Sequence, residues 1–166
     1  MFNTLVKQLE LYRLEMTQHV EISLKEAWDF FSNPANLATI TPNEMGFSIL
    51  DKVPELMYEG MLVRYKVSPF KGLRLNWTSE ITEIKHHQYF IDEQIEGPYK
   101  YWHHEHHFKE TETGVELRDI LYYKIPLGAL GRLINKPVVR KKLNAIFAYR
   151  QRKIEALFTN VNLSNG

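Results

Sequence analysis

Cysteine is absent from this 166-residue sequence. Its absence excludes disulfide bonds and thiolate metal sites, and it favours a reducing compartment, so we expect a cytoplasmic protein. The first residues show no charged segment followed by an apolar run, so no signal peptide is expected. A net charge of only +1 provides no overall attraction to nucleic acid, and no nucleic-acid partner is expected either.

Motifs for nucleophilic catalysis and phosphate binding are missing as well. The sequence has no Gly-x-Ser-x-Gly elbow and no serine with an evident base. One glycine-containing stretch, Gly128–Gly131, precedes an expected helix, but it lacks the strand–loop–helix context and the lysine of a phosphate-binding loop. No cofactor is therefore expected.

The C-terminal stretch has the periodicity of a long amphipathic helix. At 100° per residue its apolar side chains fall within an arc of about 120°. They are Val139, Leu143, Ile146, Phe147, Ile154, Leu157 and Phe158. The stretch is too polar to span a bilayer, so no stable membrane insertion is expected. Pro137 predicts a kink or a short leading helix, and Arg150 lies near the centre of the apolar arc, where it either snorkels out or meets a partner inside.

The rest of the sequence predicts strands and two short helices. The first strand is expected near residues 11–18, followed by one helix capped by Ser23 and another that begins at Asn33-Pro34. Six more strands are expected at 47–53, 61–67, 73–84, 89–95, 99–109 and 115–125. Helices segregated from a run of antiparallel strands indicate an α+β fold. We expect one domain, residues 1–166 with a core at about 11–158, in which a curled seven-stranded sheet grips the long helix around an internal cavity.

Strand alternation assigns several ionisable side chains to this interior. They are Glu93, His104, His106, Asp119 and Arg150. Each one alone fits a structural role, but five together favour a polar patch in a ligand cavity, because unpaired burial would be costly. The expected apolar walls of this cavity are Trp77, Trp102, Phe108, Tyr123 and Phe147.

A metal site is an alternative for the same residues. His104 and His106 with Glu93 or Asp119 would resemble a two-histidine, one-carboxylate centre. Histidines two apart on a strand do point the same way, but this spacing is common in proteins without metal. We therefore expect no metal, and in particular no stoichiometric zinc or iron.

Several stretches resemble the START-like, or SRPBCC, superfamily, particularly a bacterial branch of small ligand-binding proteins. The stretches are 27–37, Ile40-Thr41-Pro42, Asp92-Glu93-Gln94, Gly97-Pro98-Tyr99, Trp102 with His104, His106 and Phe108, 126–133, and 146–150. The resemblance covers residues 11–158 and implies the helix-grip fold, a curved seven-stranded antiparallel sheet around a long C-terminal helix with a hydrophobic cavity between. His103 and His107 lie outside the pattern and are expected at the surface.

These observations together favour a module that binds a small hydrophobic or amphipathic molecule, with the ionisable side chains orienting the polar end of the ligand. One alternative is a cyclase or dehydratase, in which a cavity histidine moves protons, Asp119 or Glu93 fixes its tautomer and Arg150 holds an oxyanion. A further alternative comes from the resemblance, because this branch is sometimes joined to an NAD-dependent epimerase-like domain. In this alternative the protein is an interaction module for an epimerase-like partner.

Overall fold

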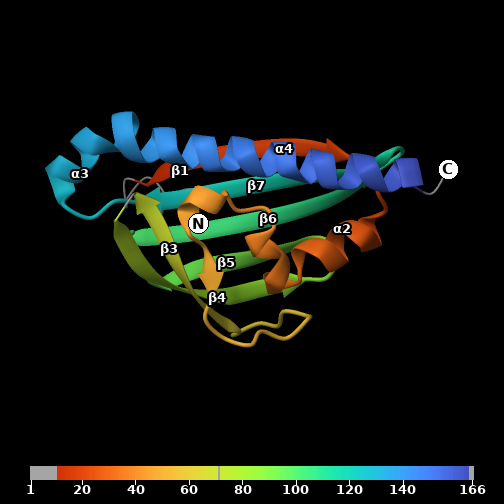
Figure 1. Cartoon of the computed structure of the whole chain (residues 1–166), viewed down its shortest axis with the longest axis horizontal. Coiled ribbons are helices and arrows are strands. Elements are labelled where there is room, and N and C mark those ends of the chain that lie inside the picture. Colours follow the sequence, from red (N-terminus) through yellow and green to blue (C-terminus); the bar gives the residue numbers. More distant parts are fainter. Residues whose placement is uncertain (1–10, 71, 165–166) are drawn as a thin grey trace.

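A seven-stranded antiparallel sheet curves beside one long helix (Figure 1). The structure is a computed structural model, and it describes residues 11–70 and 72–164. The strands are β1 Tyr12–Val20, β2 Ser48–Ile49, β3 Leu62–Phe70, β4 Leu73–Lys85, β5 Tyr89–Glu96, β6 Tyr101–Thr111 and β7 Gly114–Lys124. Their order is β1-β7-β6-β5-β4-β3-β2. Consecutive strands from β2 to β7 therefore pair with each other, and β1 pairs with β7. The predicted α+β helix-grip fold is confirmed.

Two short helices follow β1, as predicted. In α2, Leu24–Phe31, the Ser23 hydroxyl accepts a hydrogen bond from the Glu26 backbone N–H, and the Glu26 carboxylate accepts one from the Ser23 N–H. This capping box satisfies two backbone donors that a helix start leaves free. The second helix, η1, is a 3₁₀ helix at Pro34–Ala38 capped by Asn33. A third, η2, at Asn43–Met45 was not predicted.

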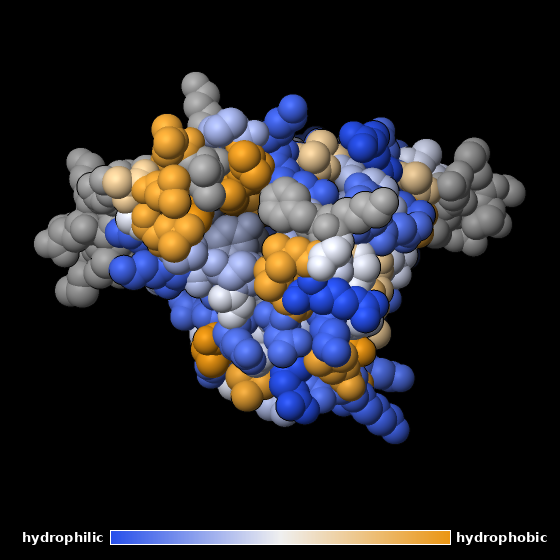
Figure 2. Space-filling view, turned by 60° about the vertical axis from the view of Figure 1, so that its left-hand side comes forward, coloured by the Kyte–Doolittle hydropathy of each residue, from blue (hydrophilic) through white to orange (hydrophobic). Residues whose placement is uncertain are grey.

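The C-terminal helical region has three parts. They are α3 at Gly128–Ile134, a π-helical stretch η3 at Asn135–Arg140, and α4 at Lys141–Ser164. Pro137 has no backbone N–H to donate and lies within η3, which accounts for the break between the two α-helices. α3 lies at one end of the molecule (Figure 1), and Figure 2, with that end turned forward, shows apolar side chains gathered in part of the surface. No helix in the described chain is long and apolar enough to cross a membrane.

The buried face of α4 agrees with the predicted apolar arc. Leu143, Phe147 and Ile154 are buried, and Leu143 and Phe147 pack against Leu121 and Tyr123 of β7. The Tyr123 hydroxyl donates a hydrogen bond of 3.0 Å to the buried side chain of Asn135, which ties η3 to the sheet. The long helix is therefore held to the sheet at both its core-facing side and its start.

Two strand predictions were wrong. The strand expected at 47–53 forms only two paired residues, Ser48 and Ile49. In β5 the faces are the reverse of those predicted. Asp92 pairs with His104 and shares the inner face, whereas Glu93 pairs with His103 on the outer face. Glu93 therefore does not reach the interior.

The outer face of β5 and β6 carries its own ion pairs. Glu93 Oε1 lies 2.6 Å from His103 Nδ1, and Glu105 Oε1 lies 3.4 Å from His103 Nε2. Burial alone would lower the pKa of His103, but its hydrogen bonds to Glu105 and Glu93 raise that pKa to about 9. His103 was expected at the surface, yet it is only 7% exposed, between the rings of Tyr101 and Tyr122. His107 is partly exposed.

Candidate functional site

A mostly apolar hollow between the helices and the inner face of the sheet, here called the main pocket, has a volume of about 140 Å³. It has room for on the order of ten water molecules. It is lined by Phe30, Phe31, Asn33, Pro34, Asn36, Leu37, Ile40, Met57, Val63, Tyr65, Ser79, Ile81, Phe90, Asp92, Trp102, His104, His106, Asp119 and Arg150. The lining comes from α2, η1, the inner face of the sheet and α4, so it is a pocket between helices and sheet. Apolar walls with a few grouped polar atoms are typical of a small-molecule site.

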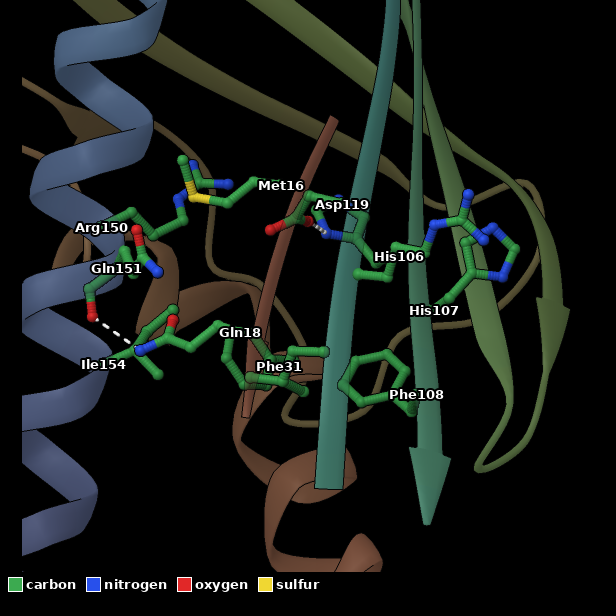
Figure 3. Close-up of a pocket in the computed structure, with 12 residues that line it drawn as sticks. Met16, Gln18, Phe31, His106, His107, Phe108, Asp119, Arg150, Gln151 and Ile154 are labelled. Carbon is green, nitrogen blue, oxygen red and sulfur yellow. Dashed lines mark hydrogen bonds and ion pairs between the residues drawn. The ribbon is translucent and has the colours of Figure 1, made fainter. Parts of the chain in front are cut away.

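Arg150 enters this region from α4 (Figure 3). Its Cζ lies 5.5 Å from the centre of the Phe147 ring. Its Nε is buried and, among the described residues, has no hydrogen-bond partner. A buried guanidinium N–H without an acceptor is unusual in a folded protein, because desolvation is then uncompensated.

A smaller hollow, the side pocket, is drawn in Figure 3 and adjoins the main pocket, with which it shares lining residues. Its volume of about 20 Å³ accommodates roughly one water molecule. His106, Asp119 and Arg150 line both pockets, so they form part of the wall between them. Gln18 closes one side of it by donating a hydrogen bond of 2.9 Å to the backbone carbonyl of Gln151.

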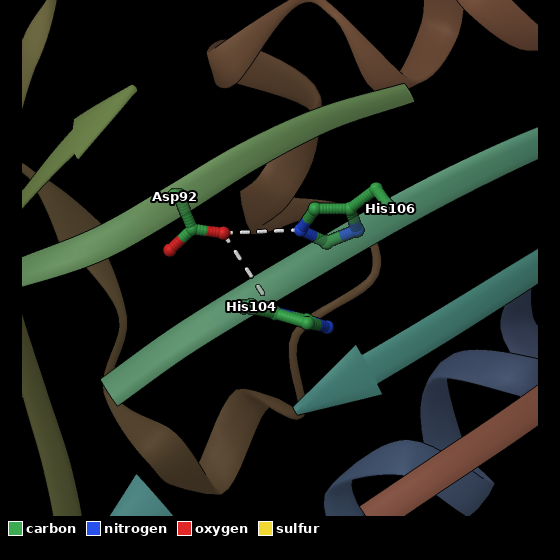
Figure 4. A group of neighbouring side chains, drawn as sticks. All are labelled: Asp92, His104 and His106. Atoms are coloured by element: carbon green, nitrogen blue, oxygen red, sulfur yellow. Dashed lines mark hydrogen bonds and ion pairs between the residues drawn. The ribbon is translucent and has the colours of Figure 1, made fainter. Parts of the chain in front are cut away.

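Asp92, His104, His106 and Asp119 form a compact ionisable cluster on the pocket wall. Figure 4 draws the first three of them. His106 Nε2 lies 3.0 Å from Asp92 Oδ2, and His106 Nδ1 lies 2.7 Å from Asp119 Oδ1. His104 Nδ1 lies 3.7 Å from Asp92 Oδ2, and His104 Nε2 lies 3.3 Å from Asp119 Oδ1. Both carboxylates therefore face both imidazole rings, whose centres are 3.9 Å apart.

The sheet register brings these residues together. In β6, His104 and His106 are two residues apart and point to the same face. Asp92 lies opposite His104 on β5, and Asp119 lies opposite His106 on β7. Three adjacent strands thus place two acids on either side of two histidines.

Neighbours on β3 and β4 hold Asp92 in place. The Ser79 hydroxyl lies 3.3 Å from Asp92 Oδ1 and accepts a hydrogen bond of 3.1 Å from Trp77 Nε1. The Tyr65 hydroxyl lies a further 3.1 Å from Ser79 Oγ. These contacts fix the carboxylate before any ligand arrives, since a buried and bonded side chain has little rotamer freedom left.

The two histidines titrate in opposite directions. Burial alone would lower the pKa of His106, but hydrogen bonds to Asp119 and Asp92 outweigh burial and raise it to about 9. Burial and then the charge on His106 lower the pKa of His104. Burial would raise the pKa values of Asp92 and Asp119, but their histidine contacts lower both. At neutral pH the cluster therefore holds two carboxylates, one imidazolium at His106 and one neutral imidazole at His104.

The predicted binding residues divide into three groups. Those that line the main pocket are Trp102, His104, His106, Asp119 and Arg150. Those that lie elsewhere in the interior are Trp77, Phe108, Tyr123 and Phe147, with Phe108 lining the side pocket. Glu93 is on the outer face. The sequence interpretation missed Asp92, Tyr65 and Ser79, and it did not assign pocket roles to α2 and η1.

A signal for Asp92 was present in the sequence. A hairpin centred on Pro98 places residues at equal distances before and after it opposite each other, and Asp92 and His104 are each six positions away (98 − 92 and 104 − 98). Gly97-Pro98 is a turn sequence, so this register was available. Because His104 was already assigned to the interior, its partner Asp92 belonged there too.

Asp92, His104 and His106 also have the spacing of metal ligands. One oxygen or nitrogen from each lies within 4.8 Å of the others. Binding a dication between them requires His106 to release its proton, because Nε2 would become the ligand atom. That proton already balances the carboxylates, and Arg150, which lines the same pocket, adds a further positive charge.

We therefore expect the purified protein to carry no stoichiometric zinc or iron at neutral pH. Elemental analysis of protein purified without chelators checks this, with the His104→Ala/His106→Ala variant as the matched control. About one metal ion per chain in the parent, absent from the variant, would contradict the expectation.

Comparisons with known proteins place the chain in a family. The model of the family described as "Polyketide cyclase / dehydrase and lipid transport" matches residues 20–147. A search of curated proteins finds no significant match. Among solved structures, protein TTHA0849 of Thermus thermophilus is similar, with 13% identity, a TM-score of 0.69, and coverage of 90% of this chain and 99% of that one.

Two further structures share the fold. Major latex-like protein 151 of Panax ginseng has 15% identity and a TM-score of 0.63, with coverage of 89% of this chain and 97% of that one. StfQ, described as a di-domain ARO/CYC from the steffimycin biosynthetic pathway, has 16% identity and a TM-score of 0.68. The match to StfQ covers 92% of this chain and 52% of StfQ, about half of its length. The resemblance to the START-like superfamily is thus confirmed, and the chain belongs to the polyketide cyclase/dehydrase and lipid transport family.

Proposed function

We propose that this protein binds a small, mostly apolar molecule with an anionic end, and that this end lies against Arg150 in the main pocket. The observation that carries the proposal is the buried Arg150 Nε without a partner among the described residues. Arg150 is in none of the described ion pairs, although its charge helps to lower the pKa of Asp92 from a longer range. An oxyanion on the ligand would accept the free N–H, and hydrogen bonds to charged groups are among the strongest available to a pocket.

The polar wall leaves Arg150 available for such a ligand. Asp92 and Asp119 are already engaged by His106, so neither competes for the guanidinium at hydrogen-bond distance. His106 is protonated and lies on the same wall, which adds a second positive charge. The polar end of the pocket therefore favours an anion over a cation.

The remaining walls suit an aromatic or branched aliphatic body. They include Phe30, Leu37, Ile40, Met57, Phe90 and Trp102. Burying apolar ligand surface against them supplies most of the binding free energy, and the polar end supplies orientation.

A matched pair of probes tests the charge of the ligand. 1-Naphthoate is a flat aromatic carboxylate, and 1-naphthamide is its neutral analogue of nearly the same shape. We expect Arg150→Met to weaken 1-naphthoate about 10- to 150-fold, the range for a lost charge-assisted hydrogen bond, and to change 1-naphthamide less than about threefold. Trp102→Ala should weaken both probes, because it removes a shared wall. Fluorescence titration measures the affinity of the parent and of each variant for both probes.

Arg152→Met is the control, because Arg152 is exposed on the same helix and should affect neither probe. Equal losses for naphthoate and naphthamide in Arg150→Met would mean that Arg150 contributes packing and not charge recognition. Native mass spectrometry of freshly purified protein then identifies any ligand that the protein retains.

A second function is favoured by the opposite pKa shifts of the two neighbouring histidines, His104 and His106. His106 holds a proton and His104 lacks one at neutral pH, so a general acid and a general base stand side by side on the pocket wall. Arg150 would stabilise a developing oxyanion. The family includes polyketide cyclases and dehydrases by its description, and StfQ is a di-domain ARO/CYC, so acid–base chemistry on a bound ligand is the alternative proposal.

Product analysis separates binding from catalysis. The retained ligand is incubated with the parent and with His106→Ala, and its mass is followed. Unchanged ligand with both proteins supports binding alone. Conversion by the parent, with a loss of a hundredfold or more in His106→Ala and little change in affinity, identifies an enzyme.

A further inference from the structure

We propose that the α3 end of the molecule docks onto membranes that contain anionic phospholipids. The inference is independent of the pocket. It begins with four large apolar side chains that are 41% to 74% exposed and lie close together in the sequence around α3 and η3. These are Leu127, Leu130, Leu133 and Val138, here called the leucine patch.

The local structure turns the leucine patch outward. Leu130 and Leu133 are three residues apart within α3, so they are neighbours on its surface, and Leu127 is the N-cap residue that precedes the helix. Gly131 of α3 is buried, and a Cβ atom there would lie 2.2 Å from the Pro126 carbonyl oxygen, so the helix packs closely against the preceding chain at this residue. α3 therefore rests on the chain through a glycine and presents its leucines to the outside.

Leu127 itself is held in an unfavourable conformation. Its φ of 74° and ψ of 16° lie in the left-handed region, which is rare for a bulky residue. The side chain is nevertheless 66% exposed, so it gains little packing within the fold. A strained and exposed leucine is more easily understood if its side chain packs against something outside the chain.

The charge around the patch has one sign. Between Asp119 and Glu155 the sequence has no acidic residue, but it has Lys124, Arg132, Lys136, Arg140, Lys141, Lys142, Arg150, Arg152 and Lys153. Of the described side chains, Arg140 and Lys141 are exposed at the end of η3 and the start of α4. Lys100 and Lys124 line a surface groove together with Leu127. The segment that carries the patch is therefore basic, and two cations, Lys100 and Lys124, share a groove with Leu127.

The exposed apolar side chains and the nearby cations together indicate what binds at the leucine patch. Apolar side chains rimmed by Lys and Arg match the interfacial region of a bilayer with anionic headgroups, where leucines enter the acyl boundary and cations meet phosphates. A second copy of the chain fits poorly, because a two-fold contact would bring the same basic, acid-free segment against itself. α3 has only seven residues, so the contact is peripheral and does not insert a helix across the bilayer.

Vesicle co-sedimentation tests the proposal with the full chain. We expect the parent to bind vesicles of phosphatidylcholine with phosphatidylglycerol at least tenfold more tightly than pure phosphatidylcholine vesicles, and to be released by high salt. The Leu130→Ser/Leu133→Ser variant should lose at least tenfold in this affinity. Both positions are exposed, so its thermal melting should match that of the parent.

The control is Leu56→Ser/Leu62→Ser, which removes two leucines elsewhere that are also more than half exposed and should leave vesicle binding unchanged. Absence of binding by the folded parent overturns the proposal, as does an unchanged affinity in Leu130→Ser/Leu133→Ser. Poly-L-glutamate provides the remaining comparison. If it binds as tightly as the vesicles and the leucine substitutions alter neither affinity, the surface recognises an acidic macromolecule and the bilayer proposal is wrong.

Discussion

Leu143→Asp is expected to abolish the cooperative folding of the domain. Leu143 is 4% exposed and lies on α4 in the cluster with Leu121, Tyr123 and Phe147. Removing a buried leucine side chain costs about 2–5 kcal/mol, and burying a carboxylate without a partner adds further cost. The sum approaches the whole free energy of unfolding of an ordinary domain, roughly 5–15 kcal/mol. Thermal unfolding followed by circular dichroism measures the effect.

Asn144→Asp is the matched control, because it adds the same charge to the same helix at an exposed position. It should melt within a few degrees of the parent. Phe147→Asp is a weaker test, since the Arg150 guanidinium lies 5.5 Å from the Phe147 ring and would partly neutralise the new carboxylate. A Leu143→Asp variant that melts together with the parent would show that α4 does not pack on the sheet through this face.

The elements of the fold were predictable because their signals are local. The capping box at Ser23, the Asn33-Pro34 start and the apolar arc of α4 each depend on residues within a few positions. The inner face of β6 was also predicted correctly, since Trp102 and Phe108 anchor the alternation that carries His104 and His106 inward. The fold class followed from the order of these elements.

The error at Glu93 has a physical cause. In β5 the apolar residues Tyr89, Ile91 and Ile95 lie on the outer face, and Ile95 is 58% exposed. The inner face carries Phe90 and Asp92, which line a pocket with polar groups. Where a strand faces a ligand site, hydrophobic alternation no longer identifies its inner face, because the interior there is not uniformly apolar.

Pocket walls were harder to predict than buried positions. Alternation shows that Trp77 and Tyr123 point inward, and both are buried. It does not show which part of the interior the other side chains leave unfilled. That depends on where α2 and η1 lie over the sheet, which is a matter of tertiary packing and not of local pattern. His103 illustrates the same limit on the outer face, where aromatic neighbours bury a histidine expected in solvent.

His106→Leu is expected to lower the free energy of unfolding by about 3 kcal/mol or more at neutral pH. His106 contacts Asp92 at 3.0 Å and Asp119 at 2.7 Å, so its loss removes the imidazolium that both buried carboxylates share. Breaking a buried ion pair from one side costs roughly 3–5 kcal/mol, because the other charge remains without compensation. The leucine side chain itself fits an apolar neighbour, the ring of Phe90, which now stacks on His106 at 4.3 Å.

The difference in unfolding free energy between the parent and His106→Leu depends on pH, and the pKa of His106 sets its direction. In the parent the pKa of His106 is raised to about 9, so its contribution to stability is complete below the ordinary histidine value and is lost as pH rises through 9. In His106→Leu that alkaline loss disappears. Without His106 the carboxylates of Asp92 and Asp119 keep only their longer contacts with His104, of 3.7 and 3.3 Å. Burial then raises their pKa values, so the variant regains stability relative to the parent as pH falls towards their ordinary values. Urea unfolding at about pH 5, 7 and 9 measures both trends.

His107→Leu is the control, because His107 is partly exposed on the opposite face and contacts only Glu105 among the described ion pairs. It should change stability by less than about 1 kcal/mol. A His106→Leu variant with the pH profile and stability of the parent would mean that His106 does not carry the charge that holds Asp92 and Asp119 in the pocket wall.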